Sequence, residues 1–115
     1  MSVIIYHNPR CSKSRQALQL LQERRIEPQV IEYLKTPPDA DTLRSLLAQL
    51  GIGPRDLLRR KEAEYKALGL DDPGLSDDEL IQAMVEHPRL IERPIVITDK
   101  GAAIGRPPEN ILEVL

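Results

Sequence analysis

The 115-residue sequence contains no phenylalanine, no tryptophan, 3 tyrosines and one cysteine. With so few aromatic rings, the core has to be built from Leu, Ile, Val and Ala, and a cofactor that stacks on aromatic side chains is disfavoured. A single cysteine excludes an internal disulfide and a zinc site made of four thiolates. Any chemistry at Cys11 is therefore that of a lone thiol, and we expect no bound cofactor or metal.

A strong charge of one sign is also missing. The chain has 16 basic and 18 acidic side chains, a formal net charge of -2, which argues against general binding to nucleic acid or to an anionic membrane. Residues 1–6 carry no basic leader and are apolar for only a few positions, so the sequence predicts neither a signal peptide nor a membrane span there. We expect a single domain over residues 1–115 and a cytoplasmic location.

The first third of the chain shows the pattern of a β-α-β unit. A β-branched run predicts a strand over 3–6, apolar residues at helical spacing predict a helix over 11–25, and alternating residues predict a strand over 29–34. Two strands joined by a helix of this length are expected to be parallel, with a right-handed connection.

The rest of the chain is predicted to be helical first and then to return to strands. The expected elements are helices over 41–50 and 54–60, a loop over 68–74, a helix opened by the capping box at 76–79 and ended by His87-Pro88, a hairpin with strands over 95–98 and 102–104, and a closing helix over 108–115.

This order of elements, β-α-β, a helical insertion and then β-β-α, is that of the thioredoxin fold. We therefore predict an α/β, thioredoxin-like fold, with a small mixed sheet flanked by helices and a helical insertion between the two halves. Arg93-Pro94 precedes the strand predicted over 95–98, where this fold places a cis-proline facing the active site. The sequence does not determine the isomer, because only about 5% of X-Pro bonds in folded proteins are cis.

Cys11 lies between a predicted strand end and a predicted helix start, in the segment 7–15 (HNPRCSKSR). Unpaired backbone N–H groups and the helix dipole favour anions at such a position, and a thiolate is an anion. Basic neighbours such as Arg10, Lys13 and Arg15 act in the same direction. Together these effects can lower a cysteine pKa from about 8.5 to between about 3.5 and 7.5, which makes the thiol nucleophilic at neutral pH.

The alternative is that Cys11 is a small hydrophobic core residue, as most single cysteines of cytosolic proteins are. A core cysteine would stand in an apolar run. Cys11 is instead flanked by Arg10, Ser12 and Lys13, and this favours a reactive thiol.

The segment His7-Asn8-Pro9-Arg10-Cys11, followed by Ser14-Arg15, resembles the signature loop of the glutaredoxin-coupled arsenate reductase (ArsC-like) family, in particular its YfgD-like branch. Further motifs follow in the family's order and approximate spacing, so that the resemblance covers essentially the whole chain. They are Tyr33-Leu34 with Pro37-Pro38, Leu57-Leu58-Arg59, His87-Pro88, Arg93-Pro94-Ile95-Val96 and Gly105-Arg106-Pro107.

The resemblance implies a catalytic Cys11 that attacks arsenate, with Arg59, Arg93 and Arg106 around the oxyanion. Guanidinium groups suit a tetrahedral dianion because they donate two hydrogen bonds at once and never lose their charge. Each arginine taken alone would read as a solvated surface charge. Arg60 adjoins Arg59, and a shift of one residue in the predicted helix would exchange their roles.

The remaining loop residues are assigned by the same resemblance. His7 resembles the family histidine that assists deprotonation of the thiol, either as a nearby positive charge or through a hydrogen-bond network. Asn8, Ser14 and Arg15 are expected to support the loop. His87 stands at a predicted helix end, where a structural role is the better interpretation.

Two acidic pairs, Asp71-Asp72 and Asp77-Asp78, raise the question of a metal site. The ligand spacing of a calcium loop is absent. We interpret the first pair as loop solvation and the second as favourable charge at a helix N-terminus.

One cysteine cannot both attack arsenate and resolve the product. The resemblance implies that glutathione is the reductant and that glutaredoxin completes the reduction to release arsenite. The expected partners are therefore arsenate or a related oxyanion, glutathione and glutaredoxin, with no nucleic acid and no membrane. We expect the protein to act as a monomer.

Two other functions stay open at this point. Relatives with the Arg-Cys-Ser-Lys-Ser-Arg form seen over 10–15 include chromosomal proteins without an established arsenate role, so a glutathione-dependent thiol oxidoreductase or redox sensor of the same fold is the first alternative. The second is a transcriptional regulator that binds RNA polymerase and senses oxidation through a Cys-x-x-Cys pair. Ser14 occupies the place of the second cysteine, which disfavours that regulator.

Overall fold

The computed structural model describes residues 2–115, which form two compact units. The first unit takes in the chain up to Thr36 together with Arg93–Leu115, and the second is Pro37–Glu92. The second unit is the predicted helical insertion between the two halves of the sheet. That both units fold as one domain stays a prediction.

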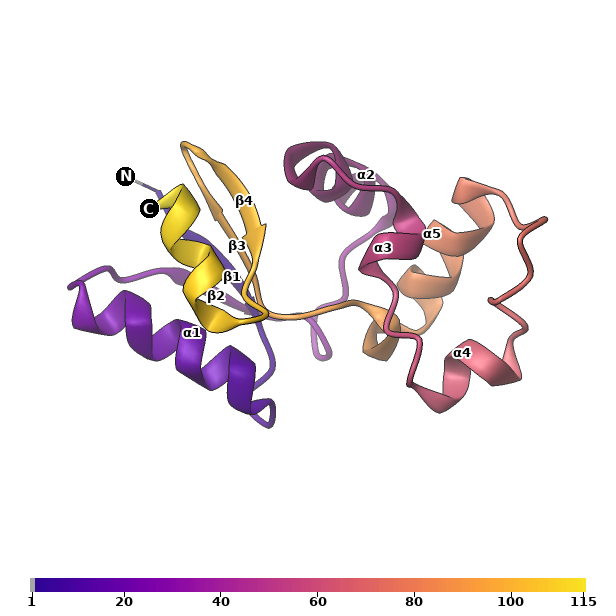
Figure 1. Cartoon of the computed structure of the whole chain (residues 1–115), viewed down its shortest axis with the longest axis horizontal. Coiled ribbons are helices and arrows are strands. Elements are labelled where there is room, and N and C mark those ends of the chain that lie inside the picture. Colours follow the sequence, from indigo (N-terminus) through magenta and orange to yellow (C-terminus); the bar gives the residue numbers. More distant parts are fainter. Residues whose placement is uncertain (1) are drawn as a thin grey trace. The chain divides into compact units, whose positions relative to one another are not determined.

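The first unit is built on a four-stranded mixed sheet (Figure 1). Its strands are β1 (Ile4–His7), β2 (Gln29–Glu32), β3 (Ile95–Thr98) and β4 (Gly101–Ile104). They lie in the order β2-β1-β3-β4, with β1 parallel to β2 and antiparallel to β3, and with β3 antiparallel to β4. The predicted α/β class, the parallel β-α-β unit and the mixed sheet are confirmed.

Two helical segments pack against this sheet and against each other: α1 (Ser12–Glu23) and the 3-10 helix η2 (Pro108–Val114). The residues that these segments pack together with the strands form one aliphatic core cluster, as expected for a chain without phenylalanine and tryptophan. It consists of Val3, Ile5, Ala17, Leu21, Val96, Ile111 and Val114. Full burial of one valine, leucine or isoleucine side chain stabilises a fold by about 1.5–3 kcal/mol. Because Ala17 and Leu21 of α1 belong to this core, their packing holds α1 in a fixed position against the sheet.

The second unit is helical. Its elements are α2 (Ala40–Leu50), α3 (Pro54–Leu57), α4 (Ala63–Ala67), α5 (Asp77–Glu86) and the 3-10 helix η1 (Pro88–Leu90). Ser76 and Glu79 form the predicted capping box at the start of α5, where the Glu79 N–H donates to Ser76 Oγ at 3.2 Å. His87 caps the other end of α5, as predicted, and Gly51 ends α2 with a φ of 70°, a left-handed conformation that favours glycine.

Three predicted elements end two or three residues earlier than expected. The helix predicted over 11–25 stops at Glu23, with Arg24 as its C-cap. The strand predicted over 29–34 stops at Glu32, because the Lys35 N–H donates back to the Glu32 carbonyl at 2.9 Å and closes a turn. The helix predicted over 54–60 stops at Leu57. Leu58 forms an isolated antiparallel bridge with Ile91 instead, so the chain is extended from this point and Arg59 does not lie in a helix.

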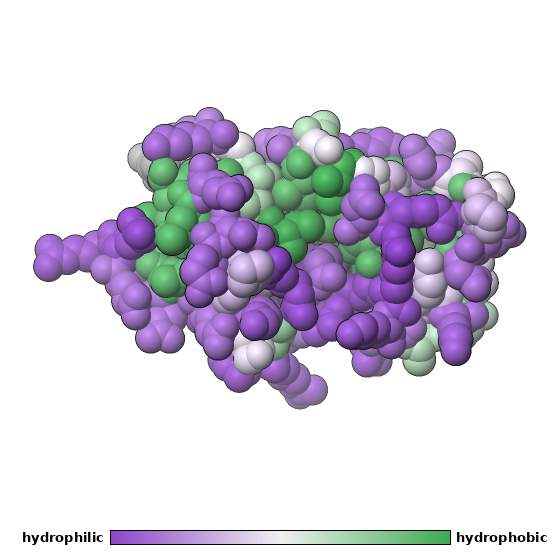
Figure 2. All heavy atoms as spheres, in the orientation of Figure 1, coloured by the Kyte–Doolittle hydropathy of each residue, from purple (hydrophilic) through white to green (hydrophobic). Residues whose placement is uncertain are grey.

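The surface drawn in Figure 2 consists largely of hydrophilic residues, interrupted by patches of hydrophobic ones. Of the residues that the structure describes, three with large apolar side chains are exposed, namely Val30, Leu34 and Leu68. Within residues 2–115, none of the helices combines the length and the apolar character needed to cross a bilayer.

Candidate active site

Cys11 lies at the N-cap of α1, at the end of the loop that follows β1. The loop is closed by its own backbone: the Cys11 N–H donates to the Asn8 carbonyl at 3.0 Å, and the Arg10 N–H donates to Asn8 Oδ1 at 3.0 Å. An Asn-Pro sequence favours such a turn, because the asparagine side chain bonds the backbone two residues on. The thiol is partly exposed, so a reagent can reach it.

The surroundings of Cys11 favour its thiolate. Partial burial raises the pKa of the thiol, but the backbone N–H of Ser14, the charge of Arg93, the backbone N–H of Lys13 and a hydrogen bond from Arg93 all lower it, and the pKa lies below its ordinary value as a result. The two backbone donors belong to the first turn of α1, which has no side-chain cap. The predicted effect of the helix start on the thiol is present. The charge, however, is supplied by Arg93 and not by the side chains of Arg10, Lys13 and Arg15, which the sequence had suggested.

Arg106 also reaches the thiol. Its Nη1 lies 3.8 Å from Cys11 Sγ and 3.4 Å from the Arg93 carbonyl oxygen, although it stands 95 residues away along the chain. The Asn110 side chain in η2 donates to the Arg106 carbonyl at 3.1 Å and fixes the backbone there. Two of the three predicted arginines, Arg93 and Arg106, are therefore brought together with Cys11 in the first unit.

Gly105 explains how the segments that carry the two arginines come so close. A Cβ added at Gly105 would lie 2.8 Å from Pro94 Cγ and 3.2 Å from Ile111 Cγ2, so only glycine fits. The Gly105 N–H also donates to the Pro94 carbonyl at 2.8 Å. The sequence placed Gly105 in a motif but gave it no role; the signal was a glycine directly before an arginine and a proline.

Both arginines precede a cis peptide bond. Arg93-Pro94 is cis, the isomer that the fold calls for at this position, and Arg106-Pro107 is cis as well. The second cis bond was not predicted from the sequence, because only about 5% of X-Pro bonds in folded proteins are cis.

His7, Ser14 and Asn8 form a buried network beneath the thiol loop. Ser14 Oγ lies 2.6 Å from His7 Nδ1 and accepts a hydrogen bond from the Asn8 N–H at 3.0 Å. The three residues are 6%, 0% and 8% exposed, in the order His7, Ser14, Asn8. Burial lowers the pKa of His7, Glu32 raises it and Arg15 lowers it, with a net shift downward, so the neutral imidazole is favoured.

Of the two roles considered for His7, a nearby positive charge or a part in a hydrogen-bond network, the structure favours the second. A neutral imidazole is not a nearby positive charge, and the hydrogen bond of His7 runs to Ser14, whose own backbone N–H acts on the Cys11 thiol. Arg15 lies at the surface and donates from Nη1 to the Pro9 carbonyl at 3.0 Å. The residues expected to support the loop thus bond to it or to one another.

Arg59 belongs to the second unit, where its neighbours are acidic. Its Nη1 lies 3.2 Å from Glu62 Oε1 and its Nε lies 3.6 Å from Glu92 Oε1, and its side chain is 18% exposed. The Arg59 N–H donates to the Leu90 carbonyl at 2.7 Å, which fixes its backbone. Arg60 is exposed. The two neighbours therefore differ in burial and in partners, in a way that the sequence could not distinguish.

The acidic pairs of the second unit serve its own folding. Asp72 accepts a hydrogen bond from the Gly74 N–H in the loop, and Asp78 pairs with Arg44 of α2 at 3.2 Å. Across residues 2–115, no group of three or more His, Cys, Asp or Glu side chains is placed to hold a metal ion.

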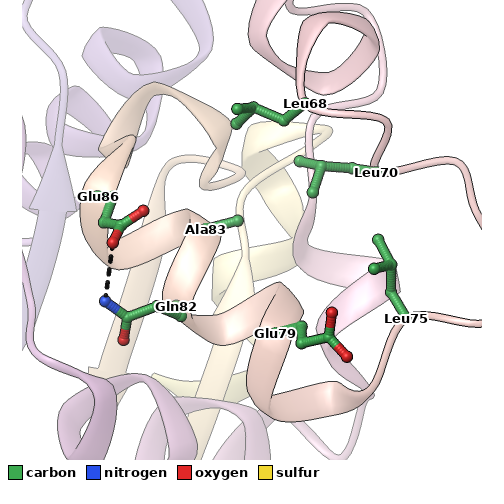
Figure 3. Close-up of a pocket in the computed structure, with 7 residues that line it drawn as sticks. All are labelled: Leu68, Leu70, Leu75, Glu79, Gln82, Ala83 and Glu86. Carbon is green, nitrogen blue, oxygen red and sulfur yellow. Dashed lines mark hydrogen bonds between the residues drawn. The ribbon is translucent and has the colours of Figure 1, made fainter.

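The second unit also contains a hollow of about 330 Å³ beside α5, shown in Figure 3. Leucine side chains line one side of it, and the carboxylates on the other side are already engaged. Glu79 belongs to the capping box of α5, and Glu86 accepts a hydrogen bond from Gln82 at 3.2 Å. This hollow carries no nucleophile and no basic group.

Known proteins match this chain over nearly its full length. Residues 6–114 match the model of the ArsC family. The chain is 58% identical over 114 residues to a protein of Escherichia coli K12 named "Uncharacterized protein YfgD", an alignment that covers 98% of this chain and 96% of that protein. It is 51% identical over 116 residues to an arsenate reductase of Haemophilus influenzae, with full coverage of both chains.

A solved structure is equally similar. The arsenate reductase from Vibrio cholerae superposes with a TM-score of 0.98 at 56% identity, covering 100% of this chain and 98% of that one. The thioredoxin-like fold predicted from the order of elements is confirmed by this match. By the family model and by its similarity to these relatives along the whole chain, the protein belongs to the ArsC family.

Proposed function

We propose that the protein is an arsenate reductase whose nucleophile is the Cys11 thiolate. The observation that carries this proposal is the convergence of Arg93 and Arg106 on a partly exposed cysteine whose pKa is lowered at the start of α1. A thiolate beside two guanidinium groups suits attack on a tetrahedral oxyanion, because the same cations that stabilise the nucleophile can hold the substrate oxygens. The names of the relatives from Haemophilus influenzae and Vibrio cholerae support arsenate as that oxyanion.

In the first step the Cys11 sulfur forms a bond to arsenic, and the bond to one arsenate hydroxyl breaks as that hydroxyl takes up a proton and leaves as water. Arsenic stays in the +5 state. Arg93 and Arg106 would donate hydrogen bonds to the remaining oxygens, where negative charge is concentrated in the transition state. Arg59 is proposed as the third donor, with Glu62 and Glu92 holding its guanidinium in a fixed orientation.

The reduction needs a thiol from outside, because the chain has no second cysteine. We propose that the glutathione thiolate displaces a second oxygen from arsenic, again as water. A glutaredoxin thiolate then attacks the glutathione sulfur and forms a mixed disulfide, and the electron pair of the broken sulfur-arsenic bond stays on arsenic, which becomes As(III). Hydrolysis of the remaining bond releases arsenite and restores Cys11.

The loop network supports this cycle in a positioning role. The Ser14 hydroxyl would donate a hydrogen bond to Nδ1 of neutral His7, while the Ser14 oxygen accepts a hydrogen bond from the Asn8 N–H. The network thereby holds the backbone N–H of Ser14 where it acts on the thiol. We place the cycle in the cytoplasm and assign it to a monomer.

A second candidate is a glutathione-dependent thiol oxidoreductase or redox sensor without arsenate specificity. The observation that favours it is that a partly exposed thiol with a lowered pKa is sufficient for thiol-disulfide exchange, with or without an oxyanion.

A coupled assay separates the two candidates. With glutathione, glutaredoxin, glutathione reductase and NADPH present, we expect arsenate-dependent oxidation of NADPH by the wild type and none by Cys11→Ser. Arg24→Ala, an exposed change at the opposite end of α1, serves as the matched control and should retain the activity. A wild type without arsenate-dependent oxidation would reject the arsenate reductase and leave the oxidoreductase.

A further inference from the structure

A cavity of about 270 Å³ lies beside the thiol loop in the first unit, outside the oxyanion site described above. It opens where β1 and β2 end, and its wall combines the loop residues before Cys11 with the turn after β2. The residues that matter for its chemistry are Pro9, Arg10, Glu32, Leu34 and Lys35. All of them lie within the first unit.

The charges of this wall are mixed, with cations in excess. Arg10 and Lys35 are basic, Glu32 is acidic, and His7 at the inner end favours its neutral form. Glu32 and Lys35 pair with each other at 3.5 Å, but their side chains are 40% and 76% exposed. An exposed ion pair of this kind is weak, so a ligand that carries both an ammonium and a carboxylate can replace each partner at little cost.

The apolar part of the wall points to a ligand that is not merely an ion. Leu34 is a large hydrophobic side chain that is 40% exposed, and it lines the cavity with Pro9. The matching ligand has apolar stretches, carries charges of both signs and is anionic overall. A small acidic peptide meets all three requirements.

The distance to the nucleophile restricts the peptide further. Arg10 in the cavity wall adjoins Cys11, and consecutive Cα atoms lie about 3.8 Å apart. An extended peptide spans about 3.3–3.6 Å per residue. Cys11 itself is not among the lining residues, so a tripeptide seated in the cavity has to extend past Arg10, by about the length of one residue, to bring its thiol to the Cys11 sulfur.

We propose that the cavity bounded by Arg10, Glu32, Leu34 and Lys35 is the binding site for the reductant glutathione, a tripeptide with two carboxylates, one ammonium and a central thiol. Arg10 and Lys35 bind its carboxylates, and Glu32 binds its ammonium. The assignment rests on the proposed function for the order of events, since it supplies the thiol that attacks after Cys11 has reacted. The same cavity would also bind glutathione in its disulfide form, when Cys11 exchanges directly with that disulfide.

The first test uses that exchange and contains no arsenate. The Cys11 thiolate attacks one sulfur of oxidised glutathione, the disulfide bond breaks, and one glutathione leaves as a thiolate while the other stays on Cys11 as a mixed disulfide. The rate is followed by mass spectrometry of the whole protein. An uncharged disulfide, 2-hydroxyethyl disulfide, reports the intrinsic reactivity of the same thiol.

Lys35→Glu should slow the reaction with oxidised glutathione about tenfold, equivalent to about 1.4 kcal/mol, and leave the rate with the uncharged disulfide unchanged within about twofold. Lys100→Glu is the matched control, because it makes the same charge change at an exposed lysine of the β3–β4 turn in the same unit. It should leave both rates unchanged. Equal slowing by the two variants, or equal slowing with the two disulfides, would overturn the assignment.

The second test keeps this proposal distinct from the arsenate chemistry. In the coupled assay, Lys35→Glu should raise the KM for glutathione about tenfold, for the same loss of contacts, and leave the KM for arsenate unchanged. If the wild type reduces arsenate but the KM for glutathione does not move, the cavity assignment fails and the reductase stands. If the wild type does not reduce arsenate but Lys35→Glu selectively slows the reaction with oxidised glutathione, the reductase fails and the cavity assignment stands.

Discussion

The two units of the molecule differ in charge and in how their contacts are made. The first unit has nine basic and six acidic side chains, a formal charge of +3, and the second has seven basic and twelve acidic ones, a formal charge of -5. The sheet of the first unit joins residues from both ends of the chain, whereas the helices of the second unit come from one continuous segment. Cys11 and the two arginines that converge on it lie in the basic unit.

The comparison shows why the net charge of the whole chain says little about its substrate. A value of -2 suggests no preference for anions, yet it averages a basic unit that carries the thiol with an acidic unit that does not. Attraction of an anion depends on the charges close to the site, because screening at physiological salt limits their reach to about 8 Å.

The largest expected effect tests whether the two units are one folding domain. Leu21 in α1 of the first unit and Met84 in α5 of the second unit are both fully buried. Replacing either by alanine should lower the free energy of unfolding by about 2–5 kcal/mol, because each change leaves a cavity. If the chain is a single domain, each variant should unfold in one transition, measured by far-UV circular dichroism, with a lower midpoint than the wild type. Each variant should also show faster amide hydrogen exchange in both units.

A matched surface change serves as the control for these two variants. Leu68→Ala, at a leucine that is 45% exposed in the second unit, should cost less than about 1 kcal/mol. If Leu21→Ala speeds exchange only in the sheet and Met84→Ala only in the helices, the chain consists of two domains and the prediction of one is wrong.

The next effect asks whether the acidic unit contributes to the chemistry at all. Arg59→Ala should lower kcat/KM for arsenate about 10²-fold or more, as is usual for the loss of one donor to a developing oxyanion. Arg60→Ala is the neighbouring control and should change it less than about twofold, because Arg60 is exposed whereas Arg59 is held by Glu62 and Glu92. Steady-state kinetics in the coupled assay measure both. A larger effect at Arg60 would exchange the two roles, and no effect at either would confine the site to the first unit.

The fold was predictable wherever a local pattern decides the structure. The strand before Asn8, the capping box at Ser76 and the helix end at His87 follow from short-range preferences, and the structure has all three. The helix expected over 54–60 ends at Leu57 instead, because Leu58 forms a β-bridge with Ile91, which is distant in the sequence. Such a bridge competes with the local helix, and nothing within the helical segment signals it.

The sequence could name residues that lie together at Cys11 in the structure, but not the geometry that brings them there. The sequence could place Cys11 at a helix start and select Arg93 and Arg106 by resemblance. It could not show that Gly105 makes their approach possible, since the need for a missing Cβ appears only when Pro94 and Ile111 are packed against it. It also left two roles open for His7, and the structure favours the neutral form because burial and the charge of Arg15 lower the pKa of His7.

That packing gives the third prediction. Gly105→Ala forces a Cβ to within 2.8 Å of Pro94 Cγ, so we expect a loss of about 1–3 kcal/mol in stability and a displaced Arg106. The control lies in the other unit: a Cβ at Gly53 meets nothing within 4 Å, and Gly53→Ala should cost less than about 1 kcal/mol through its helix cap alone. Chemical denaturation and the KM for arsenate measure the two effects. Equal losses at Gly105 and Gly53 would refute the close-packing argument.

The smallest effect concerns the thiol itself and compares one arginine from each unit. The charge of Arg93 lowers the pKa of Cys11 against the opposing effect of burial, so Arg93→Gln should raise that pKa. Only the thiolate reacts with iodoacetamide, so the alkylation rate of this variant should rise with pH at a higher midpoint than in the wild type, and the rate at neutral pH should fall. Arg44→Gln removes the same charge from the second unit, where Arg44 is paired with Asp41 and Asp78, and should leave the midpoint unchanged. Because the backbone N–H groups of Ser14 and Lys13 still lower the pKa of Cys11 in Arg93→Gln, the shift should be partial; an unchanged midpoint would mean that the start of α1, and not the basic side chains around it, activates the thiol.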